Sequence, residues 1–282
     1  FMMMSMACFA VEDTFIKLLS AKLPATQILF SIGFGGALIT LVLAIVLNVK
    51  LANKILLNKH VISRTIADLF GALSFTSAMV LIPMSLLASI LQATPLFVTL
   101  GAAILLGEKV GWRRWSAIFI GFLGVIIILQ PGYGSFQLAS LLGLAAVLCL
   151  ALRDVVTRDM ATEIPTLTVT FYACLAMGGA GFIAYPFFGP PIMPTTYEAI
   201  ILICAAIIGL TGYFLLVLAT RKGDVSVIAP FRYSRLLFSL GLASLILGEK
   251  LTLPILLGGL LVVSSGIYTF GRERASVKIQ KK

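Results

Sequence analysis

The sequence predicts an all-α integral membrane protein of about ten transmembrane helices, arranged as two inverted five-helix repeats. Composition is the first reason: 60% of the 282 residues are hydrophobic and 11% are charged, whereas about a quarter of a soluble domain is charged. The second reason is that long apolar stretches recur with short gaps between them. The third is a repeated pattern in the two halves of the chain, described below.

Apolar segments account for nearly the whole chain. A helix needs about 20 apolar residues to cross the hydrocarbon core of a bilayer, and segments such as 118–129 lack the polar–apolar alternation of a barrel strand. Pro24 and Pro165 mark turns before the next helix, and Pro254 suits a first helical turn. The expected spans are 1–19, 26–48, 61–81, 84–106, 113–130, 136–157, 166–188, 198–219, 225–247 and 253–271.

The two halves of the chain share a pattern at a fixed offset. LLGEK (105–109) recurs as ILGEK (246–250), and the same offset pairs Asp13 with Asp154. Because each half has five spans, an odd number, the second half is expected to run opposite to the first. Inverted repeats occur mainly in transporters, whose binding site lies near the midplane between the halves.

The expected domain boundaries follow from this pattern. The first repeat covers 1–131 and the second covers 136–271, joined through the sequence PGYGS (131–135). A basic tail, 272–282, follows the last span and is expected to be mobile.

The distribution of lysine and arginine predicts the orientation. If the loops alternate sides, basic residues favour one side strongly, so both termini are expected to be cytoplasmic in a multi-pass protein of the cytoplasmic (inner) membrane. Orientation also explains the net charge of +10 better than binding to nucleic acid does. The rich side carries Lys50, Lys54, Lys59, Arg64, Lys109, Arg113, Arg114, Arg158, Arg221, Lys222, Arg272, Arg274, Lys278, Lys281 and Lys282, and the poor side carries Lys17, Lys22 and Lys250.

Catalytic and metal chemistry has no visible basis in the sequence. The four cysteines fall inside apolar segments without metal-ligand spacing, and the one histidine, His60, lies in a basic loop. We therefore expect no metal, no cofactor and no enzyme activity. A scaffold without transport activity would not explain charged residues inside the spans.

The ends of the two halves carry a family resemblance. Residues 105–129 (LLGEKVGWRRWSAIFIGFLGVIIIL) and 246–270 (ILGEKLTLPILLGGLLVVSSGIYTF), together with the ten spans, resemble the EamA branch of the drug/metabolite transporter superfamily. The resemblance implies a secondary transporter; relatives move amino acids, nucleotide-linked compounds, organic ions and S-adenosylmethionine. The stretch APFRYSRLLF (229–238) is similar to the ninth helix of S-adenosylmethionine carriers.

Several charges inside the spans have a possible partner four residues away. Such spacing suits local pairing on one helix face, so we expect structural pairs, although Asp13 and Asp154 are also candidates for gating or proton coupling. The expected pairs are Asp13 with Lys17, Asp154 with Arg158, and Arg64 with Asp68.

Arg232 and Arg235 lack such a partner and share one helix face. Two guanidinium groups suit a carboxylate or phosphate of a substrate, although they could instead pair with Glu12 or with helix ends. Pro230, just before them, removes a helical hydrogen bond and is a candidate for gating.

Glu12 and Arg153 occupy equivalent places in the two repeats and also lack a local partner. They could pair across the midplane, as a gate or a structural tie, or contact the substrate. With Arg232 and Arg235 they form a set of one acid and three arginines, and this excess of positive charge favours an anionic or zwitterionic substrate.

Milder candidates surround the arginines. Ser85, Ser89 and Gln92 lie on one face of the fourth span, and Tyr233 could donate a hydrogen bond or stack on a planar group. Such residues equally serve contacts between helices. Glu108 and Glu249 lie in the two Gly-Glu-Lys turns and are expected to accept hydrogen bonds from backbone amides at the start of the next helix.

The sequence therefore predicts alternating-access transport of a small zwitterionic or anionic metabolite, such as an amino acid, an amino-acid-like compound or S-adenosylmethionine. The partners are the lipid bilayer and either a proton or an exchanged substrate. An exporter of organic cations or drugs with the same fold, and less plausibly a scaffold, remain alternatives. The small residues of 121–124 and 258–259 indicate close packing, within the fold of a monomer or in a homodimer.

Overall fold

The computed structural model is all-helical over the residues that it describes, which are 1–49, 51, 59–105, 107, 111–131, 137–157, 166–187, 191–222 and 229–280. This confirms the predicted fold class. Among the described residues, five helical stretches are long and apolar enough to cross a membrane: Ala25–Val46, Ile62–Leu81, Met84–Leu105, Leu167–Ala184 and Thr196–Leu216. The elements are α1 (Met2–Leu19), α2 (Ala25–Val46), α3 (Lys59–Leu81), α4 (Met84–Leu91), α5 (Thr94–Leu105), α6 (Trp112–Leu129), α7 (Ser140–Thr157), α8 (Thr166–Ala184), η2 (Tyr185–Phe187), α9 (Thr196–Lys222), η3 (Ala229–Tyr233), α11 (Ser234–Leu245) and α12 (Leu253–Gln280).

The fourth and ninth predicted spans are interrupted at equivalent places in the two repeats. The fourth span divides into α4 and α5, and the ninth divides into η3 and α11. Pro95 explains the first interruption, because its ring has no N–H and collides with the carbonyl of Leu91 in a continuous helix. Pro230 lies in η3 itself, where it favours a short 3₁₀ segment over a regular α-helical start.

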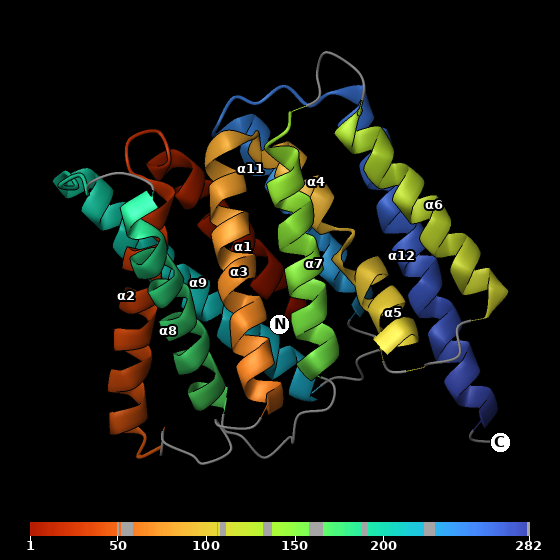
Figure 1. Ribbon diagram of the computed structural model, residues 1–282, viewed down its shortest axis with the longest axis horizontal. Coiled ribbons are helices and arrows are strands. Elements are labelled where there is room, and N and C mark those ends of the chain that lie inside the picture. Colours follow the sequence, from red (N-terminus) through yellow and green to blue (C-terminus); the bar gives the residue numbers. More distant parts are fainter. Residues whose placement is uncertain are drawn as a thin grey trace.

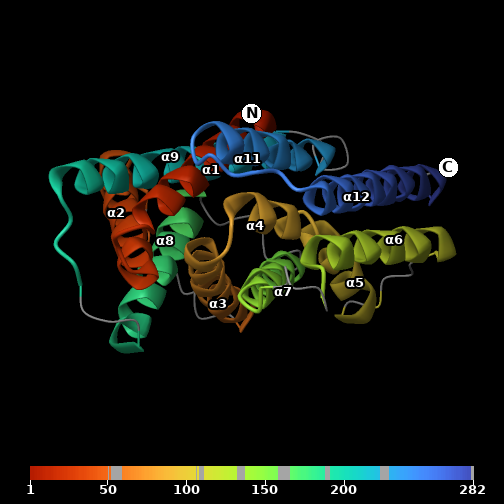
Figure 2. The ribbon, with the colours of Figure 1, turned by 90° about the horizontal axis from the view of Figure 1, so that it is seen from above.

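The packing of the helices follows the repeat. In Figures 1 and 2, α2 and α8 lie side by side at one end of the molecule, and α6 and α12 lie side by side at the other. Between these ends α1 packs on α9 and α11, while α3 packs on α7, which also contacts α4 and α5. These contacts are symmetric under exchange of the two repeats. The α2–α8 and α6–α12 contacts map onto themselves, and the contacts of α1 with α9 and α11 map onto those of α7 with α3 and α5.

Helices at equivalent places run antiparallel, so the repeats are inverted. A Cβ built on Gly36 of α2 would lie 3.0 Å from the sulfur of Cys174 in α8. The start of α2 lies against the end of α8, since a Cβ on Gly181 would lie 2.5 Å from the nitrogen of Phe30. Residues later in α2 therefore contact residues earlier in α8, as in an antiparallel pair of helices.

Glycines let these equivalent helices approach closely. Gly33 of α2 packs against the backbone of Gly178 in α8. At the other end, a Cβ on Gly124 of α6 would lie 2.8 Å from the carbonyl oxygen of Gly258 in α12. The small residues at 121–124 and 258–259 therefore serve contact between helices within the fold.

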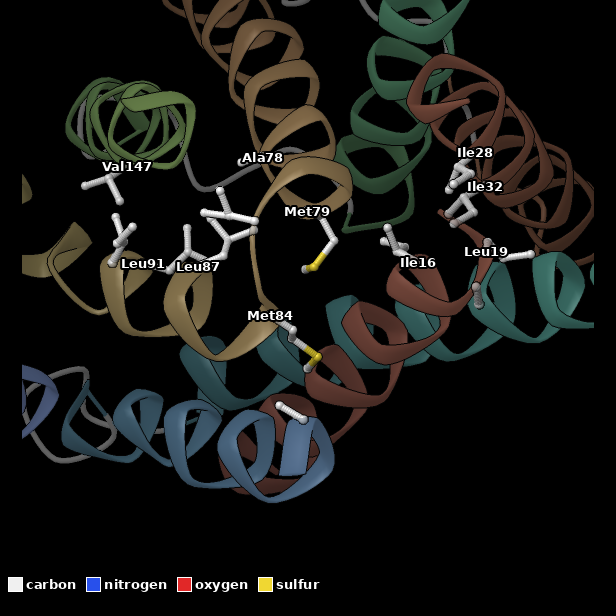
Figure 3. Close-up of a cluster of buried hydrophobic side chains, with 14 of the residues drawn as sticks. Ile16, Leu19, Ile28, Ile32, Ala78, Met79, Met84, Leu87, Leu91 and Val147 are labelled. Carbon is white, nitrogen blue, oxygen red and sulfur yellow. The ribbon is translucent and has the colours of Figure 1, made fainter. Parts of the chain in front are cut away.

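The apolar core lies where α1 and α3 end and α2 and α4 begin. Figure 3 shows Ile16, Met79 and Met84 gathered in the space between α1, α3 and α4. Ile28 and Ile32 extend the same cluster along α2. All five side chains are at most 6% exposed, so this end of the molecule is densely filled.

Two charged side chains complete helix ends beside this core. Glu249, in the turn before α12, accepts hydrogen bonds from the backbone amides of Met84 (2.7 Å) and Ser85 (2.9 Å) and from the Ser85 hydroxyl (2.6 Å). The predicted chemistry is confirmed for Glu249, but the helix it serves is α4 of the opposite repeat and not the next helix. The other predicted residue, Glu108, lies outside the described residues.

Lys17 serves the neighbouring helix end. Its Nζ donates to the carbonyl oxygens of Met79 (2.8 Å) and Ile82 (2.7 Å), at the end of α3. The predicted pairing of Lys17 with Asp13 is wrong, because the free carbonyls at a helix C-terminus attract a cation and the lysine stem reaches them.

Other expectations fall on or beside parts of the chain outside the described residues. These are Arg158, the loop residues 132–135 of the proposed linker and the end of the tail.

The helix α12 continues to Gln280, whereas the tail was expected to be mobile. Residues 272–280 contain arginine, glutamate, alanine and lysine, which favour helix, and neither glycine nor proline to end it.

We predict that Glu249→Ala lowers the free energy of unfolding by about 1–3 kcal/mol, because two backbone amides at the start of α4 lose their acceptor. Thermal unfolding in detergent measures the change. Lys250→Ala alters the adjacent exposed side chain and should have little effect. Equal melting temperatures for Glu249→Ala and the unaltered protein would contradict the capping role.

A second prediction concerns the contact of α2 with α8. A Cβ on Gly178 would lie 2.9 Å from the nitrogen of Phe34, whereas a Cβ on Gly179 would have nothing within 4 Å. Gly178→Ala should therefore destabilise the protein by about 1–3 kcal/mol. Gly179→Ala should stabilise it by roughly 0.5–1 kcal/mol, because alanine favours helix over glycine. The reverse order of melting temperatures would refute the packing.

Candidate functional site

Asp13 and Arg235 form an ion pair inside the spans that is joined by three hydrogen bonds. The guanidinium of Arg235 donates from Nη2 to both oxygens of Asp13, at 2.9 Å and 2.8 Å, and from Nε to Oδ2 at 3.2 Å. Asp13 comes from α1 of the first repeat and Arg235 from α11 of the second. Arg235, which has no partner at the local spacing, thus pairs with Asp13 and not with Glu12, because a forked guanidinium makes a stronger pair with Asp13 than Lys17 can.

The ring of Phe9 adds to this pair. The guanidinium carbon of Arg235 lies 5.3 Å from the centre of the Phe9 ring, a cation–π geometry. The side chain of Asp13 is 4% exposed. The pair is therefore a buried tie between the two halves.

A second group of charges joins α3, α7 and η3. Arg153 of α7 contacts Asp68 of α3 at 3.2 Å and its own neighbour Asp154 at 2.7 Å. Asp154 also lies 3.6 Å from Arg232. The predicted pair of Arg64 with Asp68 is confirmed, at 3.7 Å.

These contacts overturn two expectations. Glu12 and Arg153 do not pair with each other, because Arg153 reaches Asp68 and Asp154 instead. The supposed excess of positive charge also disappears, since Arg235 and Arg153 have carboxylate partners. Asp68 gains a part in the group that its spacing to Arg64 alone did not reveal.

Tyr213 of α9 was not singled out in the sequence. Its hydroxyl oxygen accepts a hydrogen bond from Nη2 of Arg64, at 3.2 Å. One tyrosine in a long apolar helix carries no distinctive spacing, so only the fold brings it to the arginine.

Arg232 is the most accessible of these guanidinium groups. Its side chain is 39% exposed, against 24% for Arg235 and 22% for Arg153. Its contact with Asp154 is also the longest of the pairs that Asp154 makes. Arg232 thus has donors available for another oxyanion.

Glu12 is the acid of this region without a protein partner. Its carboxylate makes no hydrogen bond or ion pair with any residue that the structure describes. It lies against Gly209 of α9, where a Cβ would be 2.5 Å from its carboxyl carbon. The side chain is partly exposed and lies within electrostatic range of Asp13 and Arg235.

The milder candidates lie apart from the ion pairs. Ser85 donates to Glu249, Ser89 donates to the carbonyl oxygen of Ser85, and Gln92 donates to that of Ala88. All three predicted side chains are at most 5% exposed. The structure uses their polar atoms within α4 and at its capped end.

Tyr233 is turned toward α12. It is 4% exposed, and its hydroxyl packs against Gly266 without a hydrogen-bond partner among the described residues. The structure therefore does not bring Tyr233 together with Arg232 and Arg235, although all three are neighbours in sequence.

The arrangement defines a class of protein. Two antiparallel repeats meet through ion pairs between their helices, with one carboxylate and one guanidinium left accessible beside those pairs. Within the described part of the chain, no group of His, Cys, Asp and Glu side chains could hold a metal ion. Inverted repeats with polar groups at their interface are the architecture of secondary transporters.

The chain belongs to the EamA-like transporter family, whose model matches residues 1–130 and 137–270. It is 22% identical over 276 residues to an S-adenosylmethionine uptake transporter of Rickettsia prowazekii, covering 98% of this chain and 92% of that protein. It is 26% identical over 261 residues to a pseudopaline exporter of Pseudomonas aeruginosa, covering 90% and 89%.

Two further similarities agree with this assignment. A riboflavin transporter of Vibrio cholerae is 30% identical over 149 residues, which cover 52% of this chain and 49% of that one. A solved crystal structure superposes with a TM-score of 0.62 at 19% identity, covering 96% of this chain and 98% of the other, and so shows the shared fold. The protein is a multi-pass membrane transporter of small metabolites.

The buried pair gives a third prediction. Asp13→Ala leaves the guanidinium of Arg235 without its carboxylate and should cost about 3–5 kcal/mol of stability. Adding Arg235→Leu removes the stranded charge and should restore much of that loss. Thermal unfolding of the double variant and of both single variants measures the coupling, with Lys22→Ala as control, because Lys22 is 71% exposed where it contacts Glu198. Additive losses would show that the two side chains act independently.

Proposed function

We propose that this transporter carries a small zwitterionic, amino-acid-like metabolite across the cytoplasmic membrane by alternating access, with both termini in the cytoplasm. The observation that carries the proposal is the placement of two opposite charges. Glu12 has no partner among the described residues, and Arg232 is exposed and loosely paired. The Asp13–Arg235 pair lies beside both charges, since Asp13 follows Glu12 in the chain and Arg235 is one helical turn from Arg232.

A zwitterion satisfies both charges at once. Its carboxylate would meet Arg232, whose planar guanidinium matches an oxyanion, and its cationic group would meet Glu12. The relatives named for S-adenosylmethionine uptake support this class, because that metabolite carries a carboxylate, an ammonium and a sulfonium. The revised charge balance favours a zwitterion over a simple anion.

The ion pairs between halves supply a mechanism for gating. The Asp13–Arg235 pair and the Arg153–Asp68 pair each join the first repeat to the second. When a substrate carboxylate approaches Arg232 and Arg235, it competes with Asp154 and Asp13 for their donors. Loss of these ties lets the halves rock, and the interrupted span at Pro230 bends with them.

Export of an organic cation is the second candidate, because Glu12 alone suits a cation. The two proposals differ in their need for Arg232. Transport of a cation without a carboxylate does not require that guanidinium, whereas transport of a zwitterion does.

The fourth prediction is that Arg232→Leu lowers zwitterion transport at least about tenfold, through loss of a charge-assisted contact. The measurement is counterflow in proteoliposomes with labelled S-adenosylmethionine, methionine, dicarboxylates and a quaternary ammonium cation. Counterflow also tests exchange directly, and a pH gradient added to net uptake tests proton coupling.

Arg113→Leu is the matched control, because Arg113 lies at the exposed start of α6 beside Trp112. Its transport should match that of the unaltered protein. Uptake of the ammonium cation alone, unchanged in Arg232→Leu, would favour the cation exporter. Zwitterion uptake that survives Arg232→Leu would remove the carboxylate role of Arg232.

A further inference from the structure

Two interfaces of the fold pack in the same register, and they differ in charge. One is α1 against α9 and the other is α7 against α3. A Cβ on Gly212 of α9 would lie 3.0 Å from the Cβ of Cys8, and a Cβ on Gly71 of α3 would lie 3.3 Å from the Cβ of Cys149. Cys8 and Cys149 are equivalent in the repeat, and so are Gly212 and Gly71, so the two interfaces share one register.

One turn along, the same register brings together different residues. In the α7–α3 interface the guanidinium of Arg153 meets the carboxylate of Asp68 at 3.2 Å. In the α1–α9 interface the equivalent residues are Glu12 and Gly209, which lie in contact. One interface thus holds a cation and an anion, and the other holds an anion beside a residue without a side chain.

We propose that the carboxylate of Glu12, where it packs on Gly209, is a cation subsite, which takes an ammonium, sulfonium or guanidinium group of the substrate. The α7–α3 interface is its template, since it shows that this position in the fold accommodates a complete pair of opposite charges. Here the chain supplies the carboxylate and the substrate supplies the cation. The inference rests on the proposed function for its role in transport and names the subsite for the positive group.

Gly209 is the residue that admits Glu12 to this position. A Cβ there would collide with both the carboxyl carbon and the oxygens of Glu12. Any side chain at 209 would therefore displace the carboxylate from the subsite. Glycine in the middle of a long helix costs about 0.5–1 kcal/mol of stability relative to alanine. The close approach of the Glu12 carboxylate gives a physical reason for a glycine at position 209.

The surroundings of the subsite limit what else can neutralise Glu12. Asp13 is held by Arg235 through three hydrogen bonds, so Arg235 has its donors directed at that carboxylate. Of the described residues, Cys8 of α1 and Cys174 of α8 also lie within electrostatic range of Glu12. None of them is a cation free to pair with it.

The test uses methylguanidinium, the chemical equivalent of the Arg153 head group, as the probe. We expect 20 mM methylguanidinium chloride to raise the melting temperature of the purified protein in detergent by about 3 °C or more over equal sodium chloride. Glu12→Gln should abolish the shift. Arg232→Leu, which alters the proposed carboxylate contact, should retain it.

A second variant guards against simple misfolding. Glu12→Arg combined with Gly209→Asp copies the Arg153–Asp68 pair into the α1–α9 interface. It should melt at or above the temperature of Glu12→Gln and show no shift with methylguanidinium, because its own arginine fills the subsite.

Two outcomes would overturn the proposal. One is an unaltered protein that methylguanidinium does not stabilise, and the other is a full shift in Glu12→Gln. A shift that depends on Glu12, in a protein whose counterflow shows no zwitterion uptake, would support the cation subsite while refuting the proposed substrate class. Failure of the subsite and failure of the proposed function are thus distinguishable.

Discussion

The cost of placing charge in an apolar interior controls how this protein is assembled. A charged side chain in a membrane span costs at least about 2.5–3.5 kcal/mol unless it finds a partner. Three arginines and three aspartates of the described residues therefore pair across helices, as in the contacts of Arg235 with Asp13 and of Arg153 with Asp68. Because these pairs join the two repeats, the same contacts that neutralise charge also hold the halves together.

Close backbone packing provides the frame around the ion pairs. Gly33 and Gly178 bring α2 against α8 at one end, and Gly124 and Gly258 bring α6 against α12 at the other. Each contact joins helices at equivalent places in the two halves. The halves are therefore in close contact at both ends of the molecule, while the charged groups lie between them.

The sequence predicted the fold more fully than the site. Hydrophobic runs reveal helices, and one constant offset reveals the repeat, because both signals are local or periodic. The partner of Asp13 was missed, since α1 and α11 are distant in sequence and a lysine at the local spacing offered a plausible alternative. Likewise Tyr233 is adjacent to Arg232, yet the short 3₁₀ segment η3 turns its ring toward Gly266.

The cap on α4 bears on how the chain is made in the cell. The acceptor of the Met84 amide is the carboxylate of Glu249, which follows it by 165 residues in the chain. During synthesis, the amides at the start of α4 thus lack their final partner until the chain has been made as far as Glu249. A chain shortened before Glu249 therefore lacks the side chain that caps the start of α4.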